Sequence, residues 1–586
     1  MPPESFISTM DKTMPRFASL CHHRTRSSLL ASVLALLTPV AAAQNVDLIF
    51  VGDNIITMDD SEVQAVAVAG DRILATGDPS AILSQATATT RIIELGDRAL
   101  LPGFIDAHGH FSSVARNAEL LDLSPPPVGG IETIDDIVAA LRYYIERRQV
   151  GEGTTVFGFG YDDSLLTEGR HPTRDDLDRA STRHPIIIRH VSGHLLVANS
   201  LALEQAGVSA TTPDPEGGII RRRENSREPN GVMEETAMGA FAGSGGGMTE
   251  LQMRALRESA MSLYAGYGIT TVQDANVSPA YVEQMRAHAA LAPFPVDIVG
   301  YVLANALSDD ELSRVEPDRE YTNGYRMGGV KFTLDGSPQG RTAWLSRPYT
   351  EGPPGAGPDY VAYPSYNPEA YLARMPDLIR RGVPVLAHAN GDAAIELMID
   401  GVESAIAGGP VPDHRSVTIH AQLARPDQLD RMRRLGIIPS FYSVHPFFWG
   451  DWHRLSFGEA RASFISPVRA TIERGIPFTI HNDSPVVPPD MMRLVAITVN
   501  RETRSGYVLG PDQRATAAEA LYAITQGAAY QYFEENEKGS ITPGKRADLV
   551  ILAVNPLHAA PSALADIAVM ETFARGKSVY SRPASP

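Results

Sequence analysis

The chain has 586 residues, which is too long for one small domain and enough for a large α/β domain with additional segments. Hydrophobic residues make up 43% and charged residues 20%, the composition of an ordinary globular protein. The net charge of -18 argues against nucleic acid as a partner and indicates a soluble, self-repelling surface.

The first 43 residues have the pattern of a secretory signal peptide. A segment rich in Arg and His is followed by the apolar run LLASVLALLTPV and then by Ala41, Ala42 and Ala43. This pattern predicts an exported, periplasmic or secreted protein without stable membrane insertion after cleavage, although an uncleaved anchor or a later start at Met10 or Met14 stays open. Because Cys21 lies in this segment, the mature chain would have no thiol for a disulfide, a nucleophile or a metal ligand.

Short runs with alternating apolar and polar residues occur near both ends of the mature chain. They lie between Gly, Asp and Asn turns at residues 44–102, and the same pattern returns at 536–586. We predict that the two segments are the halves of one composite β-sandwich, which the chain leaves and later rejoins.

Between these halves, short β-branched runs alternate with amphipathic helical stretches. The runs lie at 103–108, 269–275, 296–302, 329–336, 383–389, 416–421, 436–442 and 476–483. Eight strands that alternate with helices predict a (β/α)8 TIM barrel over residues 103–535, with a doubly wound parallel sheet as the alternative.

The connection between the first two predicted strands is too long for a plain loop. Residues of about 112–247 contain a helical pattern, two strand-like runs and a polar segment rich in Gly, Pro and Arg. We therefore predict an inserted subdomain on the upper face of the barrel. The run Arg221 to Arg223 reads as a solvated loop, with contact to an anionic substrate as the other option.

Six side chains of three types fall at the carboxyl ends of the predicted strands. They are His108, His110, Lys331, His388, His420 and Asp483. Each alone would more often be an ordinary polar or ion-paired residue. In a TIM barrel, however, the carboxyl ends of the strands converge on one pocket, so the set predicts a metal centre. Only one residue separates His108 from His110, so both side chains point the same way from an extended backbone.

The motifs LPGFIDAHGHF, VKFTLDGS, LAHANGDAA, TIHAQ, HNDSPV and GSITPGKRADLVIL resemble the amidohydrolase superfamily. The similarity is to its YtcJ-like branch (amidohydrolase family 3), which includes N-substituted formamide deformylase, and it covers nearly all of the mature chain. The resemblance implies a TIM barrel with a composite β-sandwich.

By position, the resemblance implies that His108, His110 and Asp483 bind one metal ion and that His388 and His420 bind a second position. It implies that Lys331 bridges the two after reaction with carbon dioxide, because an unmodified ammonium could not ligate metal. Zinc suits such ligands best, while iron, manganese, nickel and cobalt stay open, as does the number of ions.

The mechanism expected from this set is hydrolysis of a C–N bond by metal-activated water. A bound metal lowers the pKa of water from about 15.7 towards 7 and polarises the scissile carbonyl. Asp483 would take the proton from the water and pass it to the leaving amine. The expected substrate is a small amide or N-substituted formamide.

Candidate substrate contacts lie in two other places. The aromatic stretch 441–453 follows the seventh strand as a βα loop, and a pocket wall or packing against the insertion explains it equally well. Segments GFGYDD and VSGHLL are expected where the insertion faces the cavity. Together they contribute Tyr161, Asp162, His194, His445, Trp449, Trp452 and His453.

Two other functions remain open at this stage. One is deamination of a cyclic amidine or aminopurine on the same scaffold, which ammonia release without amide cleavage would indicate. The other is a non-catalytic exported binding or regulatory protein that has kept the fold. Binding alone does not require all six side chains, which argues against the second option. The sequence also leaves open whether the chain forms a homodimer.

Overall fold

The computed structural model describes residues 45–244 and 249–583. The predicted signal peptide at 1–43, with Cys21, lies outside the described residues, as do the last three residues of the predicted insertion. Among the described helices, none combines the length and the apolar character needed to cross a bilayer.

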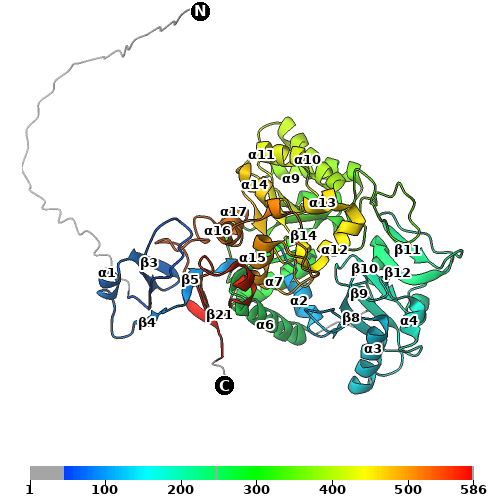
Figure 1. The fold of residues 1–586 in the computed structure, drawn as a ribbon, viewed down its shortest axis with the longest axis horizontal. Helices are drawn as coiled ribbons and strands as arrows, with labels where there is room; N and C mark the ends of the chain where they lie inside the picture. Colours follow the sequence, from blue (N-terminus) through cyan, green and yellow to red (C-terminus); the bar gives the residue numbers. More distant parts are fainter. Residues whose placement is uncertain (1–44, 245–248, 584–586) are drawn as a thin grey trace, which may run out of the picture. The chain divides into compact units, whose positions relative to one another are not determined.

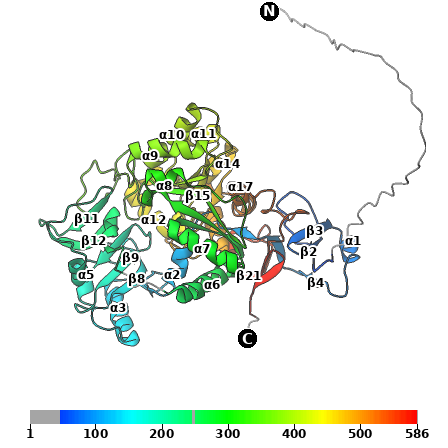
Figure 2. The same cartoon turned by 180° about the vertical axis from the view of Figure 1, so that it is seen from behind.

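A curled, eight-stranded sheet forms the centre of the fold, and every neighbouring pair of its strands is parallel (Figures 1 and 2). Side by side, its strands are β6 (Phe104–Ile105), β13 (Ile269–Val277), β14 (Asp297–Leu303), β15 (Tyr325–Thr333), β16 (Val385–Ala389), β17 (Val417–His420), β18 (Ile438–Phe441) and β19 (Thr479–Ile480). The prediction of eight parallel strands is confirmed. Their β-branched and aromatic residues are buried on both faces, as parallel sheets require. All carboxyl ends therefore lie at one edge of the sheet.

Helices follow the strands, and most of them pack against the main hydrophobic core on the outer side of the sheet (Figure 2). They include α2 (Phe111–Asn117), α6 (Glu250–Gly266), α7 (Pro279–Leu291), α8 (Asp309–Ser313), α9 (Pro368–Arg380), α10 (Asp392–Ala407), α11 (Pro426–Leu435), α12 (His445–Phe457), α13 (Glu459–Ser463), α14 (Val468–Glu473), α15 (Met491–Asn500), α16 (Ala517–Ala523) and α17 (Gln526–Gln531). Helix α10 shows why they pack. Its buried Ile395, Ile399 and Val402 recur at the spacing of one helical face, and they join the main hydrophobic core.

Two four-stranded sheets lie beside strand β6 and share a hydrophobic core. One contains β1 (Leu48–Val51), β2 (Ala65–Ala69), β3 (Arg72–Gly77) and β4 (Arg91–Glu94); the other contains β5 (Ala99–Pro102), β20 (Leu549–Leu552), β21 (Val569–Ala574) and β22 (Lys577–Ser581). Strand β5 pairs antiparallel with β20, so residues from both ends of the chain lie side by side (Figure 1). The rings of Phe50 and Phe573 meet edge to face at 5.3 Å between centroids.

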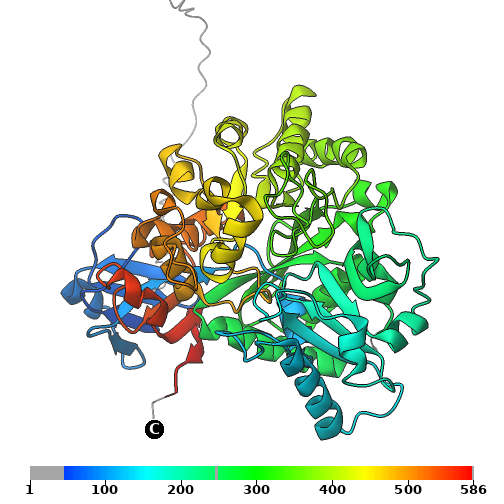
Figure 3. The same cartoon turned by 45° about the vertical axis from the view of Figure 1, so that its right-hand side comes forward.

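The chain between β6 and α6 forms a third sheet, of six strands, with its own hydrophobic cores (Figure 3). The elements are β7 (Leu121–Asp122), α3 (Ile134–Arg148), β8 (Val156–Tyr161), α4 (Arg174–Asp178), β9 (Ile186–His190), β10 (Leu195–Ala198), α5 (Ser200–Gln205), β11 (Gly218–Arg222) and β12 (Pro229–Glu235). Helix α3 begins with a capping box between Thr133 and Asp136, which satisfies its free amide groups.

Two local predictions were wrong. The arginine run does not lie in a solvated loop, because Arg221 and Arg222 belong to β11 and the Arg221 guanidinium pairs with buried Glu234 at 2.5 Å. The stretch 441–453 is not a βα loop: from His445 onwards it forms α12. Pro446 at the start of this helix is compatible with helix initiation, and the aromatic side chains then pack against the core.

Candidate active site

The six side chains predicted at the strand ends form one continuous cluster at the carboxyl edge of the central sheet. His108 and His110 lie after β6, Lys331 in β15, His388 in β16, His420 at the end of β17 and Asp483 just after β19. The rings of His388 and His420 are 4.5 Å apart, and Lys331 Nζ is 3.4 Å from His108 Nε2. Residues separated by several hundred positions in sequence thus meet because the strands are parallel and adjacent.

Asp483 is the point on which the histidines converge. Its Oδ1 atom lies 3.3 Å from His108 Nε2 and 3.2 Å from His110 Nε2, and its Oδ2 atom lies 4.0 Å from His420 Nε2. Oδ1 is buried, yet it accepts no hydrogen bond from the described residues. A buried carboxylate oxygen without a donor is costly unless a cation meets it.

His108 and His388 are each oriented through one ring nitrogen, with the other turned towards the cluster. His108 Nδ1 lies 2.6 Å from Gln273 Oε1, and His388 Nδ1 lies 3.0 Å from Asp335 Oδ1. When Nδ1–H donates to these oxygens, the Nε2 lone pair points towards the cluster, which is the arrangement that metal-ligating histidines adopt. Burial holds the pKa values of His108 and His388 well below the usual range, so both rings are neutral.

Two of the six residues have left-handed backbone conformations. The φ angle is +72° at His420 and +53° at Asp483. Such conformations cost roughly 1–3 kcal/mol each in residues other than glycine, and they cluster at functional sites. The fold therefore holds both side chains in positions that the local sequence does not favour.

Lys331 differs from an ordinary surface lysine in its charge. Burial lowers the pKa of its ammonium to about 7, although Asp483 and Asp335 act in the opposite direction. Near neutral pH a large share of this lysine therefore carries a nucleophilic, uncharged amine.

Asp483 itself remains ionised. Burial alone would raise the pKa of its carboxyl, but the contact with His110 and the neighbouring charges outweigh it, and the pKa lies below the usual range. The cluster therefore combines neutral imidazoles, a carboxylate and an amine that is readily deprotonated, all suited to a divalent cation.

Sequence reasoning missed three residues of this cluster. Gln273 and Asp335 orient the histidines, and each stands in a strand motif as a polar residue within an otherwise apolar run. His481 lies in the same HND motif as Asp483. Its ring is 5.0 Å from His108 and 5.2 Å from His420, and neither of its nitrogens has a hydrogen-bond partner among the described residues.

The insertion contributes His194 to the same cluster. Its ring lies 4.8 Å from that of His388, and its Nδ1 atom is 2.7 Å from Glu235 Oε2. Glu235 also accepts a hydrogen bond from Thr342 Oγ1 at 2.9 Å. The insertion and the central sheet thus form this side of the site together.

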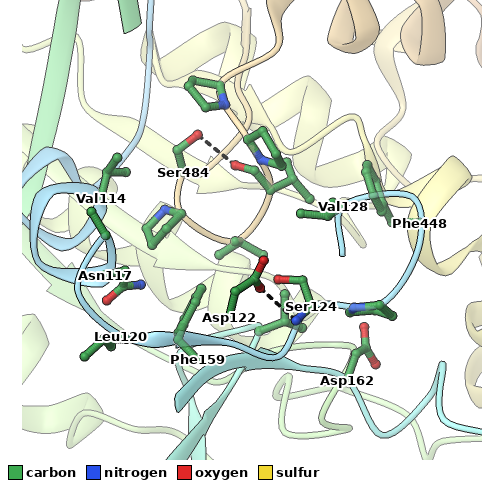
Figure 4. Close-up of a pocket in the computed structure, with 18 of the residues that line it drawn as sticks. Val114, Asn117, Leu120, Asp122, Ser124, Val128, Phe159, Asp162, Phe448 and Ser484 are labelled. Carbon is green, nitrogen blue, oxygen red and sulfur yellow. Dashed lines mark hydrogen bonds between the residues drawn. The ribbon is translucent and has the colours of Figure 1, made fainter. Parts of the chain in front are cut away.

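A cavity of about 420 Å³ adjoins the cluster (Figure 4). Apolar side chains from α2, the insertion, α6, α12 and the loop 484–489 dominate its lining. Ser484, next to Asp483, lies on its wall, although none of the six cluster residues does. Asp162 and Trp449 also line it, and Trp449 Nε1 donates to Asp162 Oδ2 at 2.6 Å.

The other predicted substrate contacts do not line this cavity. Trp452 stacks on the Arg341 guanidinium at 4.1 Å. His445 and His453 are buried and lie 3.0 Å apart, nitrogen to nitrogen. The Tyr161 hydroxyl is 3.2 Å from His171 Nδ1 within the insertion.

Comparisons with known proteins agree with this geometry. A sequence model described as an amidohydrolase family matches residues 91–580. The chain is 28% identical to N-substituted formamide deformylase of Arthrobacter pascens, over 92% of this chain and 99% of that one. It is 24% identical to amidohydrolase YtcJ of Bacillus subtilis (strain 168), over 84% and 91%. The crystal structure of an uncharacterized metal-dependent hydrolase from Pyrococcus furiosus covers 87% of this chain and 99% of its own, with a TM-score of 0.66 and 25% identity.

Proposed function

The chain belongs to the amidohydrolase family, and on that premise we propose that it hydrolyses the C–N bond of an amide or N-substituted formamide with a bound divalent metal. One observation carries the proposal: four imidazoles, one carboxylate and one low-pKa lysine converge at the carboxyl edge of one parallel sheet. The similarity to the Arthrobacter pascens deformylase supports the reaction class.

The donor set fits such a metal. His108, His110 and Asp483 would hold one ion, and His388 and His420 a second, with zinc as the first candidate. The unpartnered Asp483 Oδ1 and the outward lone pairs of His108 and His388 support this assignment.

The bridging role falls to Lys331. Its neutral amine would attack carbon dioxide, forming an N–C bond and releasing one proton, which leaves a carbamate with two oxygen donors. Burial favours the uncharged amine that this step requires.

When bound, the metal supplies Lewis-acid activation of the carbonyl and makes hydroxide available at neutral pH. The chain's residues perform the proton transfers. Asp483 accepts the proton that the attacking water loses and delivers it to the departing nitrogen, so that amide and water give acid and amine. Gln273 and Asp335 keep His108 and His388 in the required tautomer.

The cavity beside Asp483 suits an apolar substituent on the substrate nitrogen. Phe159, Phe448 and Trp449 line it, and among the described residues Asp122 and Asp162 are the only acidic ones in the lining. A benzyl or alkyl group of an N-substituted formamide would bury its surface there, with the formyl carbon at the metal cluster. His194 would contact the polar end of the substrate.

We also propose the finer architecture on the same premise. The curled sheet would close as a (β/α)8 barrel between β19 and β6, and the two terminal sheets would form one composite β-sandwich. The shared core of Phe50, Leu100 and Phe573 supports the second point. Residues 1–43 would direct export, on the pattern of their sequence.

Metal analysis combined with hydrolysis assays tests the function. We expect the purified chain to bind one or two transition-metal ions and to hydrolyse N-substituted formamides or aryl amides. The variants His108→Ala and Lys331→Ala should lose metal and activity together. His414→Ala serves as the control, since this buried histidine lies outside the cluster with both nitrogens in hydrogen bonds. A folded wild type that binds no metal in the presence of zinc and bicarbonate contradicts the proposal.

A further inference from the structure

A second group of metal-ligand side chains lies in the insertion, apart from the six-residue cluster. Asp162 and Asp163 follow β8, and His190 ends β9; ligand atoms from these three residues all lie within 4.8 Å of one another. His190 Nε2 is 3.1 Å from Asp163 Oδ1 and 3.9 Å from Asp162 Oδ1. His171 lies beside this group, with its Nε2 atom 3.6 Å from Asp163 Oδ2.

The atoms of this group that face each other lack hydrogen-bond partners. His190 Nε2 and Asp163 Oδ1 are both buried and unpartnered among the described residues. His190 is fully buried and Asp163 is 7% exposed. Unsatisfied polar atoms at this depth are unfavourable unless another species completes them.

The other ring nitrogens of the two histidines are already held. His190 Nδ1 lies 2.8 Å from Ser192 Oγ, and His171 Nδ1 lies 3.2 Å from the Tyr161 hydroxyl. For His190 this is the pattern of a metal site, in which a partner fixes one ring nitrogen and leaves the other free. Asp162 is held through both oxygens, because Ser164 donates to Oδ1 and Trp449 donates to Oδ2.

Charge leads to the same conclusion. No Lys or Arg nitrogen of the described chain lies within ion-pair distance of Asp162 or Asp163; only histidines do. A divalent cation would neutralise two buried carboxylates that have no Lys or Arg partner.

We propose that Asp162, Asp163 and His190 form a separate, structural site for a divalent transition metal, with zinc as the best match. One imidazole and two carboxylates would supply three ligands, and a water molecule would take the fourth position of a tetrahedral zinc ion. Ligand atoms around tetrahedral zinc are separated by about 3.3 Å. The His190 Nε2–Asp163 Oδ1 separation of 3.1 Å lies close to this value, and the His190 Nε2–Asp162 Oδ1 separation of 3.9 Å is somewhat longer.

The site would join the insertion to the rest of the molecule. Asp162 Oδ2 accepts the hydrogen bond of Trp449 on α12, and both residues line the cavity of Figure 4. An ion on the other side of Asp162 would fix this carboxylate and thereby one wall of the cavity. The metal would fix the shape of the cavity and would not contact the reacting atoms of the substrate.

The test measures the zinc content of a variant in which the six-residue cluster cannot bind metal. In the double variant His108→Ala/His388→Ala, we expect about one zinc ion per chain to survive gel filtration, and zinc should raise the Tm. Adding Asp163→Asn and His190→Gln should remove this ion and the shift in Tm. Since the first cluster is disabled throughout, the outcome does not depend on the proposed hydrolase activity.

His184→Gln is the matched control, because His184 is a buried histidine of the insertion whose two nitrogens have partners in Ser181 and Val150. In the double-variant background it should keep the zinc ion. If the variant with all four substitutions does not fold, the zinc content of the double variant tests the proposal by itself. A double variant that binds no zinc, or a four-residue variant that keeps it, overturns the proposal and leaves an ordinary His–Asp pair.

Discussion

The two edges of the central sheet each bury a lysine, and the two lysines have opposite properties. At the amino edge, Lys538 Nζ lies 2.6 Å from Asp297 Oδ2 and 2.9 Å from Glu534 Oε2. At the carboxyl edge, Lys331 Nζ has His108 Nε2 at 3.4 Å, and no carboxylate of the described chain pairs with it within 4 Å. Both lysines are 2% exposed.

Their surroundings therefore decide the charge. Burial disfavours both ammonium groups, but Asp297 and Glu534 outweigh it at Lys538 and raise its pKa, whereas the pKa of Lys331 falls to about 7. The amino edge is a network of ion pairs and serves stability. At the carboxyl edge, atoms that can bind a metal lack hydrogen-bond partners. This lowers the stability of the fold and leaves these atoms available to a ligand.

The largest expected effect concerns the carboxyl edge. Asp483→Asn should lower kcat for amide hydrolysis by about 10²–10⁴-fold, because the carboxamide cannot transfer the proton. Steady-state kinetics with metal analysis of the same sample checks this. A variant with full metal content and a kcat within a few-fold of wild type would refute the role of Asp483 in proton transfer.

The next effect separates the two lysines directly. Lys538→Met should lower the free energy of unfolding by up to about 3–5 kcal/mol, because it removes the buried cation that Asp297 and Glu534 share. Arg575 still pairs with Asp297 and Arg326 with Glu534, so the loss should lie below that limit. Lys331→Met should leave the stability of the metal-free chain unchanged or raise it, and should abolish hydrolysis. Denaturant unfolding of both variants measures the contrast, and equal destabilisation would show that the two edges do not differ.

A smaller effect is expected for the residue that orients His108. Gln273→Leu removes the acceptor of His108 Nδ1 and should weaken metal binding by about 10–100-fold. Gln531→Leu is the matched control: both glutamines donate to the Ala107 carbonyl, and Gln531 has no histidine partner among the described residues. Competition with a metal chelator compares the two variants. Equal losses of affinity would mean that packing alone is responsible.

The smallest effect is a slope in the pH dependence of stability. The pKa of Lys331 is about 7 in the folded chain against 10.5 for a free lysine, so between these values only the unfolded chain holds the proton. Stability of the metal-free chain should therefore rise with pH in this window, by up to about 1.4 kcal/mol per unit, and become insensitive to this group below about pH 7. Unfolding of wild type and Lys331→Met at several pH values isolates the slope. Identical slopes would contradict the low pKa.

The eight strands and most of the cluster were predictable because both depend on short patterns. A β-branched run that ends in a chemically active residue marks a strand and its carboxyl end, as for His388 and His420. The aromatic stretch 441–453 was less predictable, because its composition fits a pocket wall and a packed helix equally well. Only the position of α12 shows that Trp449 lines the cavity and Trp452 does not.

By itself, the sequence determined the order of the strands and which of them end in His, Lys or Asp, since periodicity and residue type are local properties. Only the tertiary structure decided which nitrogen of His108 is free and how low the pKa of Lys331 lies. It also brought Asp163, His171 and His190 together. These properties depend on distances between segments far apart in the chain and on the exclusion of water around them, which no local pattern of residues encodes.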